Sequence, residues 1–212
     1  MSLANNINVC ILNYGSGNVK SVYNLLKSLV DNVKISNSKD DIEKATHFIL
    51  PGVGAYGTAM EKIRKIIPIK LLEHEVFINK KPFLGICIGM HSLANKGFEF
   101  GEFNGLGWID GEVTQLNSGN NPLPHIGWNN FIKKQDSPIL KNIDEEQNFY
   151  FVHSFVFRSK KTENIVAETE YGENFVSIVQ KDNIFGVQFH PEKSQNAGKL
   201  LIKNFLALNE KK

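Results

Sequence analysis

The chain has 212 residues, 42% of them apolar, which is enough for one sizeable core and suits a single domain over residues 1–212. Its 24 basic and 22 acidic residues are spread along the chain and give a formal charge of +2, which argues against a nucleic-acid partner. No apolar stretch is long enough to span a membrane, and residues 1–6 lack the basic and apolar segments of a secretory leader, so we expect a soluble, cytoplasmic protein.

The first half alternates short apolar strands with stretches in which apolar residues recur at helical spacing. Such alternation is typical of a parallel sheet with helices on both faces. Ser38, followed by Asp41 three residues later, is placed to begin a brief helix. We predict strands at 7–12, 33–35, 47–50 and 83–84, and helices at 19–29, 56–66 and 69–77.

After Gly97 the chain is punctuated by glycine, asparagine and proline, which predicts more turns and more antiparallel strands. An amphipathic stretch at 198–208 predicts a last helix. We predict strands at 113–116, 149–157, 165–169, 175–179 and 184–189. The fold class that follows is α/β, with an open, mostly parallel sheet, flanking helices and additional antiparallel strands in the second half.

The run from Lys81 to Met90 contains a short apolar strand that leads into Cys87, with helix-forming residues directly after it. This is the pattern of a nucleophile elbow, a strand-to-helix turn that forces its central residue into a cramped backbone conformation. The residues two positions away on either side must then be small, and they are Gly85 and Gly89. Because a lone cysteine is more often a buried core residue, the elbow needs partners elsewhere in the chain.

Those partners follow in the run from Phe185 to Ser194, a strand-like segment that ends in His190 and Glu192. His190 can take the proton from the Cys87 thiol, and Glu192 can orient the imidazole and stabilise its cationic form. Cys10 lies among apolar residues, which predicts a core position and no disulfide. Since no His/Cys cluster has metal-ligand spacing, we expect neither a metal nor a cofactor.

Nearly the whole chain resembles the class I, or triad-type, glutamine amidotransferases, whose signature joins a Gly-x-Cys-x-Gly elbow to a late His-Pro-Glu. Further segments narrow the resemblance to the glutaminase subunits of imidazole glycerol phosphate synthases. These segments are Asn13–Asn18, Pro51–Gly57, Pro124–Asn129 and Tyr150–Phe155. The resemblance implies hydrolysis of L-glutamine to glutamate and ammonia, with Cys87, His190 and Glu192 as the catalytic residues.

The same resemblance implies an oxyanion hole built from main-chain N–H groups. Ile88, directly after the nucleophile, would supply one donor, and Val53 would supply another. Val53 lies between Gly52 and Gly54, and these glycines allow a peptide plane to reorient at little steric cost. In the family this strip is thought to reorganise when the partner subunit carries its own substrate, which couples hydrolysis to demand.

Other positions that the family uses for glutamine map onto Glu99, for the α-ammonium group, and onto the main chain of Ser154 and Phe155, for the α-carboxylate. The chain departs from the family pattern at His91, where a glutamine usually helps to line the substrate pocket, and at Asn13, where an aspartate is common. His91 stands one helical turn after Cys87, on the same face. It can act as a substitute hydrogen bonder, which we favour, perturb the Cys87 and His190 pair when protonated, or mark a branch with weakened activity.

Ammonia released into water would be protonated and lost, so the resemblance implies a heterodimer with a separate (β/α)₈ cyclase subunit. The cyclase would use the ammonia to make imidazole glycerol phosphate and aminoimidazole carboxamide ribotide in histidine biosynthesis. Asn18, Trp128, Tyr150 and Lys193 would line the interface. For the two aromatic residues, burial in the chain's own core is an equal alternative.

Three other functions remain open. A paralogous glutaminase could supply ammonia to another synthase, such as one that amidates a surface sugar. A γ-glutamyl hydrolase could use the same elbow, although the segments Pro124–Asn129 and Tyr150–Phe155 argue against it. A catalytically degenerate subunit could dock and regulate without hydrolysing glutamine, which the intact Cys87, His190 and Glu192 disfavour.

Overall fold

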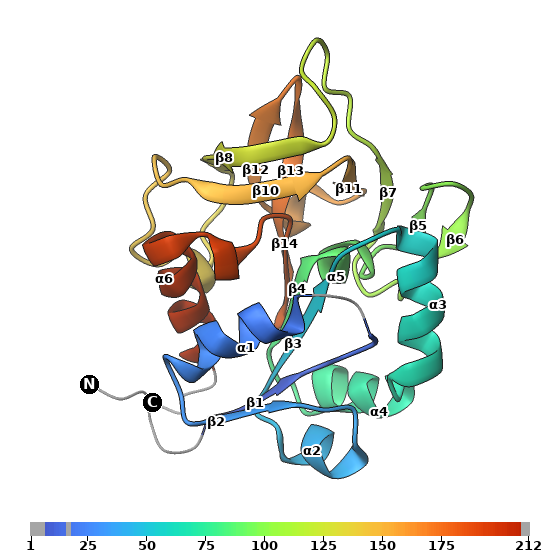
Figure 1. Ribbon diagram of the computed structural model, residues 1–212, viewed down its shortest axis with the longest axis vertical. Coiled ribbons are helices and arrows are strands. Elements are labelled where there is room, and N and C mark those ends of the chain that lie inside the picture. The colour runs from blue at the N-terminus through green and yellow to red at the C-terminus, as the bar shows by residue number, and fades with distance from the viewer. Residues whose placement is uncertain (1–6, 16–17, 209–212) are drawn as a thin grey trace.

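The computed structural model describes residues 7–15 and 18–208 (Figure 1). The predictions for residues 1–6 and for the middle of the Asn13–Asn18 segment therefore concern positions outside the described residues. In the first half, strands and helices alternate as predicted. The strands are β1 (Asn8–Ile11), β2 (Asn32–Ile35), β3 (His47–Gly52) and β4 (Phe83–Cys87), and the helices are α1 (Val19–Lys27), α2 (Lys39–Lys44), α3 (Tyr56–Ile66), α4 (Ile69–Glu73) and α5 (Ile88–His91).

The second half is dominated by strands, also as predicted. They are β5 (Lys96–Gly97), β6 (Phe103–Asn104), β7 (Gly111–Gln115), β8 (His125–Asn129), β9 (Ile132–Lys133), β10 (Phe149–His153), β11 (Phe155–Ser159), β12 (Ile165–Tyr171), β13 (Glu173–Lys181) and β14 (Ile184–Val187). Short 3₁₀ turns are η2 (Pro138–Leu140), η3 (Thr162–Asn164) and η4 (Pro191–Lys193). The last helix, α6 (Gln195–Leu206), begins three residues earlier and ends two residues earlier than the apolar pattern predicts.

One sheet of twelve strands forms the centre of the fold, with the order β2-β1-β3-β4-β14-β13-β11-β7-β5-β6 along its main path. Strands β2, β1, β3, β4 and β14 are parallel neighbours, whereas β13 and β11 continue the sheet in antiparallel pairs. Helices α1 and α6 lie on one side of the parallel strands and α3 and α4 on the other (Figure 1). The predicted α/β fold class is therefore confirmed.

The parallel strands bring several predicted site residues to one edge of the sheet. In the register of β3 against β4, Gly52 lies opposite Cys87, so the glycine strip and the elbow leave the sheet side by side. In the register of β14 against β4, Val187 lies opposite Ile86, so the chain that continues to His190 leaves at the same level. Ligands of open α/β sheets bind outside the carboxyl ends of the strands. This edge is therefore where a site is expected.

Two of the predicted elements are wrong in detail. The predicted strand at 149–157 is two strands, because the chain bends at Ser154 and changes partners. Strand β10 pairs with β8 in a separate two-stranded sheet, and β11 pairs with β7 and β13 in the main sheet. The predicted helix at 69–77 is α4 followed by a π-helical turn, η1 (His74–Ile78). Apolar periodicity alone does not reveal a change of strand partner or of helix type.

Local signals elsewhere are confirmed. Ser38 accepts a hydrogen bond from the Asp41 backbone N–H at 3.2 Å and caps the start of α2. Cys10 is a free thiol, 1% exposed, in the middle of β1.

Within residues 7–15 and 18–208, none of the helices combines the length and the apolar character needed to cross a membrane. The single-domain assignment over 1–212 stays a prediction.

Candidate active site

Cys87 occupies a strained turn between β4 and α5. Its φ is 53° and its ψ is −109°, a backbone conformation that residues other than glycine rarely adopt. Close packing requires the neighbouring glycines. A Cβ at Gly85 would lie 2.4 Å from the Gly89 carbonyl oxygen, and a Cβ at Gly89 would lie 1.8 Å from the Leu50 carbonyl oxygen. The turn therefore has the geometry of a nucleophile elbow.

His190 and Glu192 form a buried pair beside the elbow. The His190 Nδ1–H donates to Glu192 Oε1 at 2.7 Å, and the two side chains are 1% and 0% exposed. The Asn18 amide also donates to this Glu192 oxygen, so two donors hold the carboxylate in place. Among the described residues His190 Nε2 has no hydrogen-bond partner. The ring thus directs its free nitrogen away from Glu192, as a general base requires.

The charge state of His190 follows from its neighbours. Burial disfavours the charged ring, but the Cys87 sulfur and the Glu192 carboxylate favour it more strongly, and together they raise the pKa of His190 from 6.5 to about 10. The Cys87 sulfur is therefore near the ring, although without ideal hydrogen-bond geometry, as is common for catalytic pairs before substrate binds. An imidazolium at neutral pH is consistent with this pKa.

The glycine strip packs directly against the elbow. A Cβ at Gly52 would lie 2.8 Å from the Cβ of Ile88 and 2.3 Å from the Tyr14 hydroxyl, so only glycine fits there. Gly54 has a φ of +98° and open space around it, and Val53 between them is 36% exposed. The predicted oxyanion residues Val53 and Ile88 thus lie on segments that meet at Cys87.

The predicted substrate residues Glu99, Ser154 and Phe155 already have partners in this structure. Glu99 Oε2 accepts from the Tyr56 N–H at 2.7 Å, at the start of α3. The carbonyl of Ser154 accepts from Leu116 N at 2.9 Å, and that of Phe155 accepts from His153 Nδ1 at 3.0 Å. Main-chain N–H groups would therefore be the contacts that these two residues offer to a carboxylate. Their substrate roles stay predictions.

His91 lies in the interior and contacts Gln188, which was not among the predicted site residues. Its side chain is 2% exposed, and its Nε2 lies 2.6 Å from the Gln188 side-chain oxygen. Burial lowers the pKa of His91 to about 4, so the ring is neutral at pH 7. The Gln188 amide nitrogen in turn lies 3.7 Å from the Cys87 sulfur. The available signal was position, since Gln188 precedes His190 by two residues in the segment that follows β14.

The residues predicted for the partner interface fall into two groups. Trp128 is 48% exposed, with its ring 6.0 Å from that of Tyr150 in an edge-to-face contact. The Lys193 ammonium lies 5.2 Å from the centroid of the Tyr150 ring. We call these three residues the aromatic cluster. Asn18 instead contacts Glu192. The cluster and His190 are joined through the backbone, because the His190 N–H donates to the Tyr150 carbonyl at 2.9 Å.

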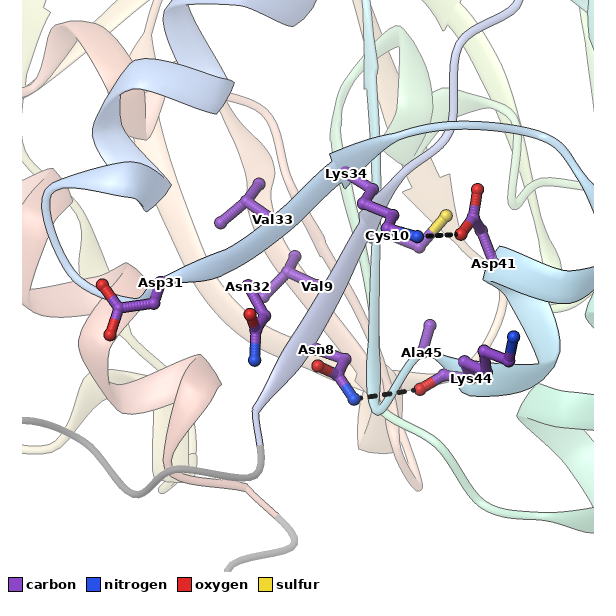
Figure 2. Close-up of a pocket in the computed structure, with 10 residues that line it drawn as sticks. All are labelled: Asn8, Val9, Cys10, Asp31, Asn32, Val33, Lys34, Asp41, Lys44 and Ala45. Atoms are coloured by element: carbon purple, nitrogen blue, oxygen red, sulfur yellow. Dashed lines mark hydrogen bonds and ion pairs between the residues drawn. The ribbon is translucent and has the colours of Figure 1, made fainter.

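A cavity of about 300 Å³ lies at β1, β2 and α2. Figure 2 shows the residues that line it. The Lys34 ammonium pairs with the Asp41 carboxylate there at 2.5 Å. None of the ten residues that line the cavity is a predicted site residue, and the Cys87 elbow is not part of it. Within the described part of the chain, no cluster of His, Cys, Asp and Glu side chains has the grouping of a metal site.

Comparisons with known proteins agree with this geometry. The family model "Glutamine amidotransferase class-I" matches residues 10–208. The imidazole glycerol phosphate synthase subunit HisH 2 of Pseudomonas aeruginosa is 41% identical over 201 residues, which cover 94% of this chain and 99% of that protein. Subunit HisH 1 of Campylobacter jejuni strain RM1221 is 40% identical over 201 residues, which cover 94% of this chain and 100% of that protein.

A solved structure of PurLQS from Thermotoga maritima supports the fold alone, with a TM-score of 0.74 at 18% sequence identity, covering 95% of this chain and 98% of that chain. The family match extends from β1 to the end of the described residues and includes the elbow and the His190 turn. The chain therefore belongs to the class-I glutamine amidotransferases and, within them, to the family of HisH subunits of imidazole glycerol phosphate synthase.

Proposed function

We propose that this chain is the glutaminase subunit of an imidazole glycerol phosphate synthase and that it hydrolyses L-glutamine with Cys87 as the nucleophile. The observation that carries the proposal is the strained Cys87 elbow beside a buried His190 and Glu192 pair. The same combination of nucleophile, base and orienting carboxylate operates in other triads. The HisH relatives are named as subunits of that synthase, which supports the choice of pathway.

The reaction begins with attack of the Cys87 thiolate on the side-chain amide carbon of glutamine. His190, kept protonated by its neighbours, donates its proton to the nitrogen, and ammonia leaves as the thioester forms. Water, deprotonated by the now neutral His190, then attacks the thioester. Glutamate leaves and the Cys87 sulfur returns to its starting state.

Each tetrahedral intermediate carries an oxyanion that needs donors in a preorganised position. We assign this role to the main-chain N–H groups of Ile88 and Val53, because the elbow and the glycine strip meet at the nucleophile. Loss of one donor from such a hole typically costs about two to three powers of ten in rate. Gly52 and Gly54 give the strip the freedom to turn a peptide plane toward the site.

The ammonia would pass to a cyclase subunit with a (β/α)₈ barrel, docked over the aromatic cluster of Trp128, Tyr150 and Lys193. Two observations support this surface as the docking site. Trp128 is a large side chain half exposed, and a cavity of about 370 Å³ opens between it and the start of α6. The Tyr150 carbonyl holds the His190 N–H, so a partner on this surface would sit next to the catalytic turn.

Coupling between the two subunits follows from burial of the catalytic groups. Cys87 is 5% exposed and His190 1% exposed, so the isolated chain leaves little room beside them for a molecule as large as glutamine, although a small alkylating reagent can still reach the sulfur. We expect low turnover of glutamine alone and a rise when the cyclase and its own ligand are added. A lone subunit with full activity would contradict this coupling.

The decisive test uses Cys87→Ala with a purified cyclase subunit. Synthesis of imidazole glycerol phosphate from glutamine should be lost, whereas synthesis from added ammonium salt should be unchanged, because the cyclase then needs no glutaminase. If glutamine-dependent synthesis survives in this variant, the nucleophile is wrongly assigned. A degenerate docking subunit would instead give no glutamine-dependent synthesis even with the wild-type chain.

A paralogous glutaminase that feeds another synthase would have the same triad, so the partner must be tested separately. The chain should restore growth of a histidine auxotroph that lacks its own glutaminase subunit, and the Cys87→Ala variant should not. Failure of the active wild-type chain to restore growth would point to another ammonia acceptor. We place the protein in the cytoplasm, where reducing conditions keep its two free thiols reduced.

A further inference from the structure

A buried polar pair, Gln188 and His91, lies beside the Cys87 sulfur. Gln188 and His91 are both buried, at 0% and 2% exposure, and their side chains meet at 2.6 Å between Gln188 Oε1 and His91 Nε2. The other end of the Gln188 amide, Nε2, is 3.7 Å from the Cys87 sulfur. Burial of a polar group costs free energy unless a hydrogen-bond partner offsets its loss of hydration, so the partners of this pair are informative.

The proton positions in this pair follow from chemistry. A side-chain carbonyl oxygen can only accept, so His91 Nε2 must carry the proton that lies between them. His91 is neutral, which leaves its Nδ1 as an acceptor, and that atom has no hydrogen-bond partner among the described residues. The His91 contact therefore fixes the Gln188 amide with its oxygen toward α5 and its NH₂ toward the sulfur.

The opposite orientation of the amide is disfavoured when the sulfur is ionised. It would bring the Gln188 oxygen against the thiolate, so that two electron-rich atoms would face each other. It would also require the proton of His91 to move to Nδ1, where no acceptor is present among the described residues. The orientation with the NH₂ toward the sulfur is therefore the one that suits a nucleophile.

We propose that Gln188, held by His91, is a positioning residue that donates a hydrogen bond to the Cys87 sulfur and stabilises its thiolate. Gln188 and His190 both belong to the segment that follows β14, and the sulfur has a neutral donor in the first and a cationic neighbour in the second. The role of His91 is then indirect: it acts through Gln188 and does not contact glutamine. This inference rests on the proposed function but concerns a property of the thiol that is measurable without a partner or substrate.

Other titratable groups near the sulfur must be considered in a pH experiment. They are His190 with Glu192 from the turn after β14, His91 from α5, and His153 from β10. Burial lowers the pKa of His153 well below 6.5, with smaller contributions from neighbouring histidines, so it is neutral across the useful range. His91 is neutral above about pH 4 as well. Changes at Gln188 therefore report on the thiol and its His190 partner.

The experiment measures the rate of iodoacetamide alkylation of Cys87 against pH in the isolated full chain. Gln188→Leu removes the donor at similar volume, and we expect the midpoint of the profile to rise by about one pH unit, the amount that one hydrogen bond to a charged group supplies. His91→Leu leaves the amide unanchored and should raise the midpoint by a smaller amount. His91→Gln restores a donor to the amide oxygen and should return the midpoint to that of the wild type.

Ser177→Ala is the matched control. Ser177 is buried in β13, its hydroxyl has no partner among the described residues, and its carbonyl accepts from the Gln188 N–H at 2.9 Å. The variant removes a buried polar atom beside Gln188 without touching the amide, and its alkylation profile should match the wild type. Protection of Cys10 from the reagent reports in every variant that the fold is intact.

Two outcomes would overturn the proposal. One is a Gln188→Leu variant that is folded and has an unchanged midpoint. The other is a His91→Leu variant with an unchanged midpoint but a raised KM for glutamine, which would make His91 part of the substrate pocket. Absence of glutamine turnover in the wild type with cyclase would contradict the proposed function instead, and the alkylation profiles would remain interpretable on their own.

Discussion

The backbone strain at Cys87 can be measured by comparing alanine and glycine at the same position. Cys87 has a φ of 53°, and such a residue stores about 1 to 3 kcal/mol that the surrounding structure must offset. Glycine adopts this conformation freely, so the step from Cys87→Ala to Cys87→Gly should recover that energy. Both variants lack the sulfur, so its loss cancels from the comparison.

Cys10 provides the matched step at a relaxed position. It is buried in β1, where glycine in place of alanine costs about 0.5 to 1 kcal/mol in backbone entropy and about 0.8 kcal/mol for a lost buried carbon. The same costs apply at Cys87, where strain relief opposes them. The alanine-to-glycine step should therefore be about 1 to 3 kcal/mol more favourable at position 87 than at position 10.

Urea denaturation of the four variants gives the free energies of unfolding, provided that their m-values agree. For a chain of this size each kcal/mol corresponds to about 2 to 4 °C in Tm, which offers a second measurement. Equal alanine-to-glycine steps at the two positions would refute the claim that the elbow is strained.

Three further predictions concern the same site. Gly89→Ala places a Cβ 1.8 Å from the Leu50 carbonyl, so it should lower the free energy of unfolding by about 1 to 3 kcal/mol or more and abolish glutamine hydrolysis; a fully active variant would contradict the close packing of the elbow. The pKa of His190 is raised from 6.5 to about 10 by folding, so its contribution to stability relative to His190→Gln should be fully present below pH 6.5 and lost as the pH rises to about 10; a pH-independent difference in unfolding free energy would be inconsistent with that charge. Burial raises the pKa of the Cys10 thiol to about 12, so alkylation of the folded chain at pH 8 should give one adduct, mapped to Cys87 by peptide mass; a second adduct on Cys10 would count against its burial.

The elbow could be predicted from the sequence because the residues that it requires are close together in the chain. A strained turn needs small residues at fixed positions, and Gly85 and Gly89 stand two residues on either side of Cys87. The alternation of strands and helices likewise predicted the parallel sheet, whose carboxyl edge brings Gly52, Cys87 and the segment that leads to His190 together. Each of these inferences depends on spacing along the chain.

The features that were missed depend on pairing across the chain. The strand predicted at 149–157 changes sheets at Ser154, and an alternating apolar pattern is the same whichever partner each half has. The interface role predicted for Asn18 stays a prediction, and what the sequence did not indicate is that its amide donates to Glu192, 174 residues away. No short-range signal encodes such a contact.

His91 illustrates both a feature that spacing along the chain predicts and one that depends on pairing across the chain. Its position one turn after Cys87 predicts a place on the nucleophile's side of the helix, and its ring is linked to the Cys87 sulfur through Gln188. Its partner was not predictable, because Gln188 stands 97 residues away, just after the end of β14. A histidine ring at this position reaches the Gln188 oxygen while remaining buried, and burial keeps it neutral. A neutral ring with one proton can hold one acceptor in a fixed orientation without adding charge beside the sulfur. The departure from the family pattern at His91 is therefore compatible with an intact nucleophile, because a neutral His91 adds no second cation to the one that His190 presents to the sulfur.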